Sequence, residues 1–324
     1  MTDRTQLGIL LMLAFCALSQ FLDVSSKLAT DTIPVGQITM ARFVVQLACM
    51  IPVALIVGSP WQASVRDHAL SLARALFLIG STFCFVSGVA IMPLPDALAI
   101  VFVMPFILMV LGRMLFGQPI GPRRLAASVV GFGGAMLVIQ PSLAHLGPAA
   151  LFPLGTAVLF SFYEIVTQAL APRMHPVTMQ LHTSLWGSAI TVPLIWAAHG
   201  TGWPALDPVM PQGLAWIWLL GVGVWAAVSH LCMTFALKYA PVSTLAPLHY
   251  LEIVFAVALS YLVWGTFPNA LTLAGIGIIT GAGLYVIHRE HLAARQGRAA
   301  LLQVPPEAIR PASFAPKTPA ALAR

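Results

Sequence analysis

Ten stretches of about 20 apolar residues run almost end to end through this chain. Each is as long as a helix must be to cross the hydrocarbon core of a bilayer. Inside a bilayer the backbone polar groups must satisfy one another, so only helices and closed barrels can span it. The sequence lacks the short alternating apolar and polar stretches of a transmembrane barrel. We therefore predict an all-α membrane protein with ten transmembrane helices, at residues 7–29, 36–58, 70–91, 96–116, 122–141, 149–170, 177–198, 212–236, 243–264 and 270–288.

The charges of the loops predict the orientation of these helices. If the N-terminus is cytoplasmic, the outer loops, near residues 31–35, 92–95, 142–148, 199–211 and 265–269, contain no Lys or Arg. The inner segments carry Arg4, Arg66, Arg113, Arg123, Arg124, Arg173, Lys238, Arg289, Arg295 and Arg298. This pattern follows the positive-inside rule and predicts an inner-membrane protein with both termini in the cytoplasm. The net charge of +6 therefore reflects membrane orientation and not nucleic-acid binding.

The two halves of the chain resemble each other. Residues 93–139 can be laid on residues 241–287 without a gap, so that prolines, glycines and helix ends fall in step. A second alignment places Asp23 on Glu164. Two copies with an odd number of spans each would be inverted in the bilayer, as in many transporters. The predicted parts are two inverted five-helix repeats, residues 1–143 and 144–288, and a disordered, basic, Ala- and Pro-rich cytoplasmic tail, residues 289–324.

Charged residues inside the spans are the first candidates for a functional site, because a charge at membrane depth costs at least about 2.5 kcal/mol. Asp23 and Lys27 stand four residues apart on one helix face, where an ion pair forms easily. Lys27 alternatively extends to the lipid headgroups. For Arg42, near the outer end of its span, we expect a headgroup anchor or a partner for Asp23 in preference to a substrate contact.

Two carboxylates lie deeper in the membrane. Glu164 preserves the acidity of Asp23 in the second repeat, and Glu252 lies near the middle of its span with His249 one turn before it. Burial at that depth favours a protonated carboxyl, which suits a proton-coupled step. His230 and His249 also fit a purely structural role as hydrogen-bonded residues of the bundle. The expected substrate or proton pathway comprises Asp23, Lys27, Glu164, His230, His249 and Glu252, with Phe83, Tyr163, Trp225 and Tyr250 as aromatic lining.

Prolines and glycines predict local features of the helices. Pro105, Pro153, Pro193 and Pro247 each free a backbone carbonyl and bend a helix. Glycines are spaced for close helix packing, within the protein or at a dimer face, at Gly131, Gly133, Gly134, Gly275, Gly277, Gly281 and Gly283.

Three segments carry a family resemblance. "MARFVVQLACMIPVAL" at 40–55, "PLPDALAIVFVMPFILMVLGRMLFGQ" at 93–118 and "YAPVSTLAPLHYLEIVFAVALSYLVWG" at 239–265 resemble the second, fourth and ninth spans of EamA-type permeases of the drug/metabolite transporter superfamily. "FLDVSSKLAT" at 21–30 is similar to the first span of S-adenosylmethionine and riboflavin uptake carriers. The chain departs from the family where a Gly-Glu pair usually ends the fourth and ninth spans, since it has Gly117-Gln118 and Gly265-Thr266.

The resemblance implies a cavity between the two repeats that opens alternately to each side of the membrane. We expect a secondary transporter of a small organic metabolite, such as riboflavin, S-adenosylmethionine or a similar heterocycle or zwitterion, with proton coupling as a hypothesis. An exporter of amino acids or drug-like metabolites is the alternative within the fold, and a non-transporting membrane sensor or scaffold the alternative outside it. The sequence contains no HExxH, GxSxG or paired-cysteine motif, so we expect neither an enzyme nor a metal or cofactor. The expected partners are a small molecule and the bilayer, with the chain as a monomer or homodimer.

Overall fold

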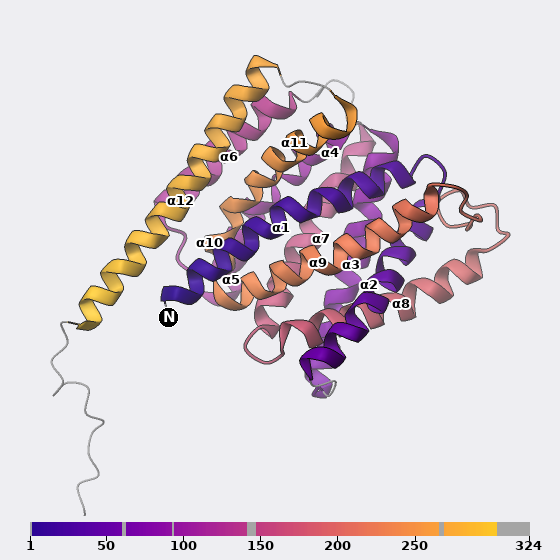
Figure 1. Cartoon of the computed structure of the whole chain (residues 1–324), viewed down its shortest axis with the longest axis horizontal. Helices are drawn as coiled ribbons and strands as arrows, with labels where there is room; N and C mark the ends of the chain where they lie inside the picture. The colour runs from indigo at the N-terminus through magenta and orange to yellow at the C-terminus, as the bar shows by residue number, and fades with distance from the viewer. Residues whose placement is uncertain (1, 60–62, 93, 141–146, 266–268, 303–324) are drawn as a thin grey trace, which may run out of the picture.

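The computed structural model describes residues 2–59, 63–92, 94–140, 147–265 and 269–302, and these residues form helices and no strand (Figure 1). The helices are α1 (Thr2–Ala29), α2 (Val35–Val57), α3 (Val65–Ile91), α4 (Leu94–Val101), α5 (Met104–Phe116), α6 (Pro122–Ile139), η2 (Pro148–Ala150), α7 (Leu151–Leu170), α8 (Pro176–Ala198), α9 (Ala215–Tyr239), α10 (Val242–Leu245), η3 (Ala246–Leu251), α11 (Glu252–Trp264) and α12 (Ala270–Leu302).

Eight helical segments of the described chain are long and apolar enough to cross a membrane, so the prediction of a multi-pass helical membrane protein is confirmed. The other two predicted spans coincide with the helices α6 and α8. Helix α6 begins with Arg123 and Arg124, and the first half of α8 carries Gln180 and His182.

Two of the spans are interrupted. The fourth divides into α4 and α5, just before Pro105, whose missing N–H leaves the turn before it without its helical bond. The ninth begins as α10, passes through the 3₁₀ segment η3 that contains Pro247, and continues as α11. The two interruptions meet, because the Tyr250 hydroxyl donates to the Phe102 carbonyl at 3.2 Å.

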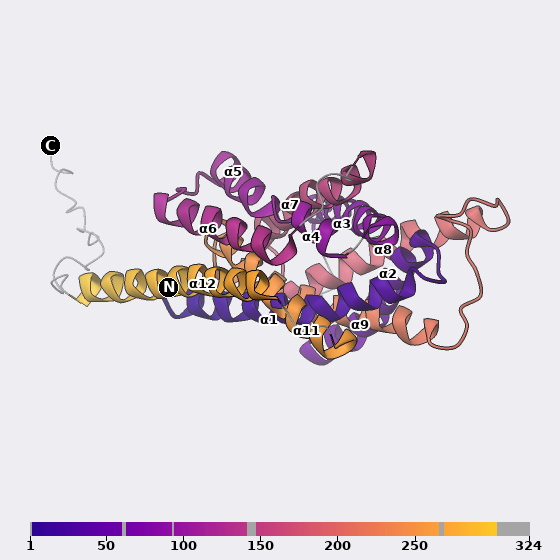
Figure 2. The same ribbon diagram turned by 90° about the horizontal axis from the view of Figure 1, so that it is seen from above.

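Four helix pairs make the most extensive contacts: α1 with α9, α3 with α7, α2 with α8, and α6 with α12 (Figures 1 and 2). The last pair crosses so closely that a Cβ on Gly275 would lie 2.6 Å from the Gly134 carbonyl oxygen. A Cβ on Gly187 of α8 would likewise lie 2.2 Å from the Phe43 ring of α2. Glycine therefore permits the close approach at both crossings, and at the crossing of α6 with α12 this is the role that the spacing of small residues predicts.

Helix α12 is longer than expected. It runs past the predicted end of the span at residue 288 and continues to Leu302, beyond the rest of the bundle (Figure 1). The expectation of disorder is therefore wrong for residues 289–302, whose Ala, Arg, Gln and Leu content favours helix. Residues 303–324 lie outside the described part of the chain.

Candidate functional site

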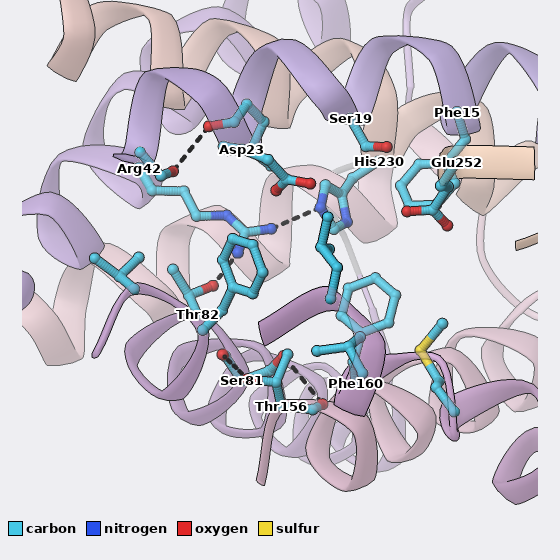
Figure 3. A pocket seen from close by; sticks show the side chains of 17 residues that line it. Phe15, Ser19, Asp23, Arg42, Ser81, Thr82, Thr156, Phe160, His230 and Glu252 are labelled. Atoms are coloured by element: carbon cyan, nitrogen blue, oxygen red, sulfur yellow. Dashed lines mark hydrogen bonds between the residues drawn. The ribbon is translucent and has the colours of Figure 1, made fainter. Parts of the chain in front are cut away.

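A cavity lies among the helices of both halves of the chain, with about 650 Å³ of space between the side chains, its open mouth included (Figure 3). Helices α1 to α5 line it from the first half, and α7, α9 and α11 line it from the second. Its lining residues are Phe15, Ser19, Leu22, Asp23, Ser26, Arg42, Ser81, Thr82, Phe85, Val86, Leu98, Val101, Met104, Thr156, Phe160, His230 and Glu252. Three of the expected pathway residues, Asp23, His230 and Glu252, are thus brought together at its wall.

Arg42 enters this cavity instead of reaching for the headgroups. Its side chain is 4% exposed, and its guanidinium donates to Thr82 of α3 and, at 2.7 Å, to His230 Nε2 of α9 (Figure 3). The expected role as headgroup anchor is therefore wrong, and Arg42 forms no direct ion pair with Asp23. A guanidinium only donates, so His230 Nε2 must accept, and a neutral His230 then carries its proton on Nδ1. That nitrogen lies 3.1 Å from the Tyr163 hydroxyl.

The Tyr163 hydroxyl also accepts a hydrogen bond from Arg74 at 2.8 Å, and Arg74 is a residue that the sequence analysis missed. The Arg74 side chain is fully buried, and no described carboxylate forms an ion pair with it. Its hydrogen-bond acceptors belong to α7, α8 and α9: Tyr163, Thr167, Gln180, Thr183, Thr234 and the carbonyl of Met179. An arginine inside the predicted span 70–91 is itself the signal that points to such a site.

A second cluster joins two acids through one histidine. His249 Nδ1 lies 2.5 Å from Glu252 Oε1, and His249 Nε2 lies 3.0 Å from Glu164 Oε1. His249 is fully buried and Glu164 is 1% exposed, whereas Glu252 borders the cavity. The contact with Glu164 is not aligned as a hydrogen bond, and neither Glu164 oxygen has a hydrogen-bond partner in the described chain. The cluster is therefore a buried group of three titratable side chains, of which Glu252 borders the cavity.

Asp23 and Lys27 do not form the easy pair that their spacing allows. Lys27 Nζ donates to the Val89 carbonyl at 2.6 Å and does not line the cavity. Asp23 faces the cavity, and among the described residues it makes neither a hydrogen bond nor an ion pair.

The aromatic lining differs from the expected one, because the cavity contains Phe15, Phe85 and Phe160. The four expected rings lie elsewhere. Phe83 is partly buried outside the cavity, Tyr163 lies behind it, Trp225 stacks on Phe21 with centroids 4.6 Å apart, and Tyr250 packs against Phe102.

At the Gly117-Gln118 end of α5, an amide stands where the family usually has an acid. Gln118 Nε2 donates to Gln168 Oε1 at 3.1 Å. The two amide oxygens accept the backbone N–H groups of Ser243 and Val242 at the start of α10. The sequence alignment that places Asp23 on Glu164 also places Lys27 on Gln168, so uncharged groups join the helices here. Thr266, at the corresponding end of α11, lies outside the described residues.

Known proteins agree with this architecture. Residues 6–140 and 147–288 match the EamA-like transporter family. The chain is 27% identical to a riboflavin transporter of Rhizobium johnstonii over 70% of this chain and 74% of that protein. It is 24% identical to an S-adenosylmethionine uptake transporter of Rickettsia bellii (83% of this chain, 89% of that protein). It is also 24% identical to a pseudopaline exporter of Pseudomonas aeruginosa (84% and 93%).

A solved crystal structure superposes with a TM-score of 0.70 over 91% of this chain and 98% of that one, at 18% identity, and thus shares the fold. The two family matches together cover most of the sequence. The chain belongs to the EamA-like transporter family.

Proposed function

We propose that this protein is a secondary transporter that carries a small organic metabolite across the cytoplasmic membrane by alternating access. The observation that carries the proposal is the cavity, whose charged and polar wall is built from both halves of the chain. A carrier needs its binding site at the contact of two bodies that move relative to each other. Asp23 and Arg42 come from the first half, and His230 and Glu252 from the second.

Two inverted five-helix repeats, residues 1–143 and 144–288, complete the proposal. The packing supports them when α4–α5 and α10–α11 are each taken as one span. If the two repeats are exchanged, α1, α2 and α3 take the places of α7, α8 and α9. The contact of α1 with α9 then corresponds to the contact of α7 with α3, which also forms. In the same way, the contact of α2 with α9 corresponds to that of α8 with α3. The pairs α2–α8 and α6–α12 are unchanged by the exchange, because each joins two equivalent helices of the repeats. Both family matches also begin and end close to these boundaries.

The proposed orientation has both termini in the cytoplasm of the cell and the protein in the inner membrane. In both views the start of α1 and the far end of α12 lie at one end of the molecule, and the loop of residues 199–214 lies at the other (Figures 1 and 2). This arrangement supports the orientation drawn from the loop charges.

The proposed coupling ion is the proton, bound by Glu164, His249 and Glu252. Two ionised carboxylates beside a neutral imidazole would place two negative charges in a buried site, which is costly. One proton on the cluster, on His249 or on a carboxyl, reduces this to one negative charge. A second proton makes the cluster neutral, and Glu252 offers it a route from the cavity.

The relatives support a metabolite as the substrate, since they are named for riboflavin, S-adenosylmethionine and pseudopaline. They include uptake carriers and an exporter, so the direction of transport follows the gradients. The substrate proposed here is a heterocycle or zwitterion of that size. The protein works as a monomer or homodimer.

Counterflow in proteoliposomes tests the proposal. Purified protein is reconstituted, unlabelled compound is loaded inside, and entry of labelled riboflavin, S-adenosylmethionine or amino acids is followed. Exchange of one compound above that of protein-free liposomes supports a carrier. A ligand-induced rise in the unfolding temperature without any exchange favours a non-transporting sensor instead.

A further inference from the structure

The cavity holds one arginine and one aspartate that face the same space without contacting each other. Asp23 of α1 and Arg42 of α2 both extend toward the middle of the cavity in Figure 3. They form no ion pair, although each lies at membrane depth, where an unpaired charge is costly. Neither charge is therefore taken up by a direct ion pair, and a molecule that enters the cavity can supply one.

The protein prevents the two from closing on each other. Arg42 is held by Thr82 of α3 and His230 of α9, so three helices fix the guanidinium in place. Its Nε is buried and has no hydrogen-bond partner among the described residues. No described residue forms a hydrogen bond that would occupy the Asp23 carboxylate. The guanidinium thus keeps an unused donor, and the carboxylate keeps its acceptors.

We propose that Arg42 and Asp23 form the subsite for an α-ammonium carboxylate, the head group of an α-amino acid. This inference rests on the proposed function and specifies its substrate class. Arg42 binds the carboxylate through charge-assisted hydrogen bonds, and Asp23 accepts the ammonium group. An α-amino acid carries its two opposite charges on neighbouring carbons, so it needs two opposite charges side by side, and its entry neutralises both.

The remaining cavity fits the rest of such a molecule. Phe15, Phe85 and Phe160 supply apolar and ring surface, and Glu252 borders the far end, on the right in Figure 3. Aromatic faces bind planar or apolar groups without demanding one orientation. The subsite therefore favours an amino acid with a large side chain, such as S-adenosylmethionine, over riboflavin, which has neither charge of the head group.

Analogues of one ligand test the head group. Binding to the purified protein is measured for S-adenosylmethionine, for its decarboxylated amine and for its deaminated 2-oxo acid. The protein should bind the intact ligand about 10- to 100-fold more tightly than either analogue, as expected for the loss of a hydrogen bond to a charged group. Arg42→Gln should abolish the preference over the amine, and Asp23→Asn the preference over the 2-oxo acid.

Exposed residues of the same charge serve as controls. Arg113→Gln and Asp31→Asn remove an arginine and an aspartate outside the cavity and should leave both preferences unchanged. Each readout is a ratio of two ligands on one preparation, so partial misfolding of a variant cancels. Arg42→Lys keeps the charge but loses the planar fork, and should retain only part of the preference over the amine.

The outcomes separate this inference from the proposed function. Unchanged ratios in Arg42→Gln, or no binding of S-adenosylmethionine and the standard amino acids to folded protein, overturn the head-group site. Exchange of riboflavin that no amino acid inhibits also overturns it and leaves the carrier intact. The predicted ratios in a protein without any flux support the site and contradict the carrier.

Discussion

Arg74→Met tests how the bundle tolerates a buried arginine with no acid beside it. Five of the six groups that accept hydrogen bonds from Arg74 keep another bond when it is removed. The hydroxyls of Thr167, Thr183 and Thr234 also donate to carbonyls of their own helices, at 2.7 to 2.8 Å. The Tyr163 hydroxyl keeps His230, and the Met179 carbonyl keeps the Thr183 hydroxyl.

Only Gln180 Oε1 loses its single partner, and Gln180 Nε2 already has no partner among the described residues. One newly unsatisfied buried group costs about 1–3 kcal/mol, so we expect Arg74→Met to lower the free energy of unfolding by that amount. Removing the partner of a buried ion pair would cost about 3–5 kcal/mol, because it strands the opposite charge. The absence of an acid beside Arg74 therefore predicts the smaller value.

The assay is denaturant unfolding in mixed micelles, followed by circular dichroism. Adding Gln180→Leu to Arg74→Met removes the stranded oxygen and should recover most of the loss. Gln180→Leu alone should be destabilising, because it deprives Arg74 of an acceptor. A loss above about 5 kcal/mol for Arg74→Met, or a double variant no more stable than it, would refute the reasoning.

Three further predictions concern coupling, packing and a loop. Glu252→Gln should abolish substrate accumulation driven by a pH gradient and spare counterflow, and accumulation by this variant would exclude Glu252 as the coupling residue. Gly275→Ala should destabilise the protein, because the new Cβ meets the Gly134 carbonyl. Gly277 has open space around it, so Gly277→Ala should raise the free energy of unfolding by about 0.5–1 kcal/mol. Equal effects of the two substitutions in thermal unfolding would contradict the packing. The backbone N–H groups of Gly200 and Gly202 donate to the Asp207 carboxylate and lower its pKa. The ionised carboxylate therefore stabilises the loop fully at a pH above the unfolded pKa of about 3.9. This stabilisation is lost as the pH falls through the lower pKa of the folded state. Asp207→Ala should therefore speed proteolysis of the loop at neutral pH, and cleavage at the wild-type rate would show that these bonds do not hold it.

The helical membrane fold was predictable because it depends on quantities that a sequence displays directly. The length of an apolar run sets whether it spans the bilayer, and the backbone then has no alternative to a helix. The breaks near Pro105 and Pro247 follow from a missing N–H, which is also local. Helix α12 beyond residue 288 was missed because the Ala-, Pro- and Arg-rich composition of residues 289–324 was taken as disorder, although residues 289–302 are mostly good helix formers.

Residues of the candidate site were predictable only where their depth in the membrane is enough to single them out. Glu164 and Glu252 stand out because any carboxylate in mid-membrane requires an explanation. The direction of a side chain is a different matter, because it depends on which helices pack around it. Phe83 and Phe85 lie two residues apart on α3 and so on different faces, and only the neighbouring helices determine that Phe85 faces the cavity. Arg42 was assigned to the lipid for the same reason.

The hydrogen bond between Tyr250 and Phe102 has a mechanical consequence. It joins the 3₁₀ segment of the ninth span to the break in the fourth span. Each helix bends most easily at these places, because α-helical hydrogen bonds are missing there. A bond between two soft points makes them bend together. The fourth and ninth spans are therefore connected at the points where they bend most easily, so a bend in one span is transmitted to the other.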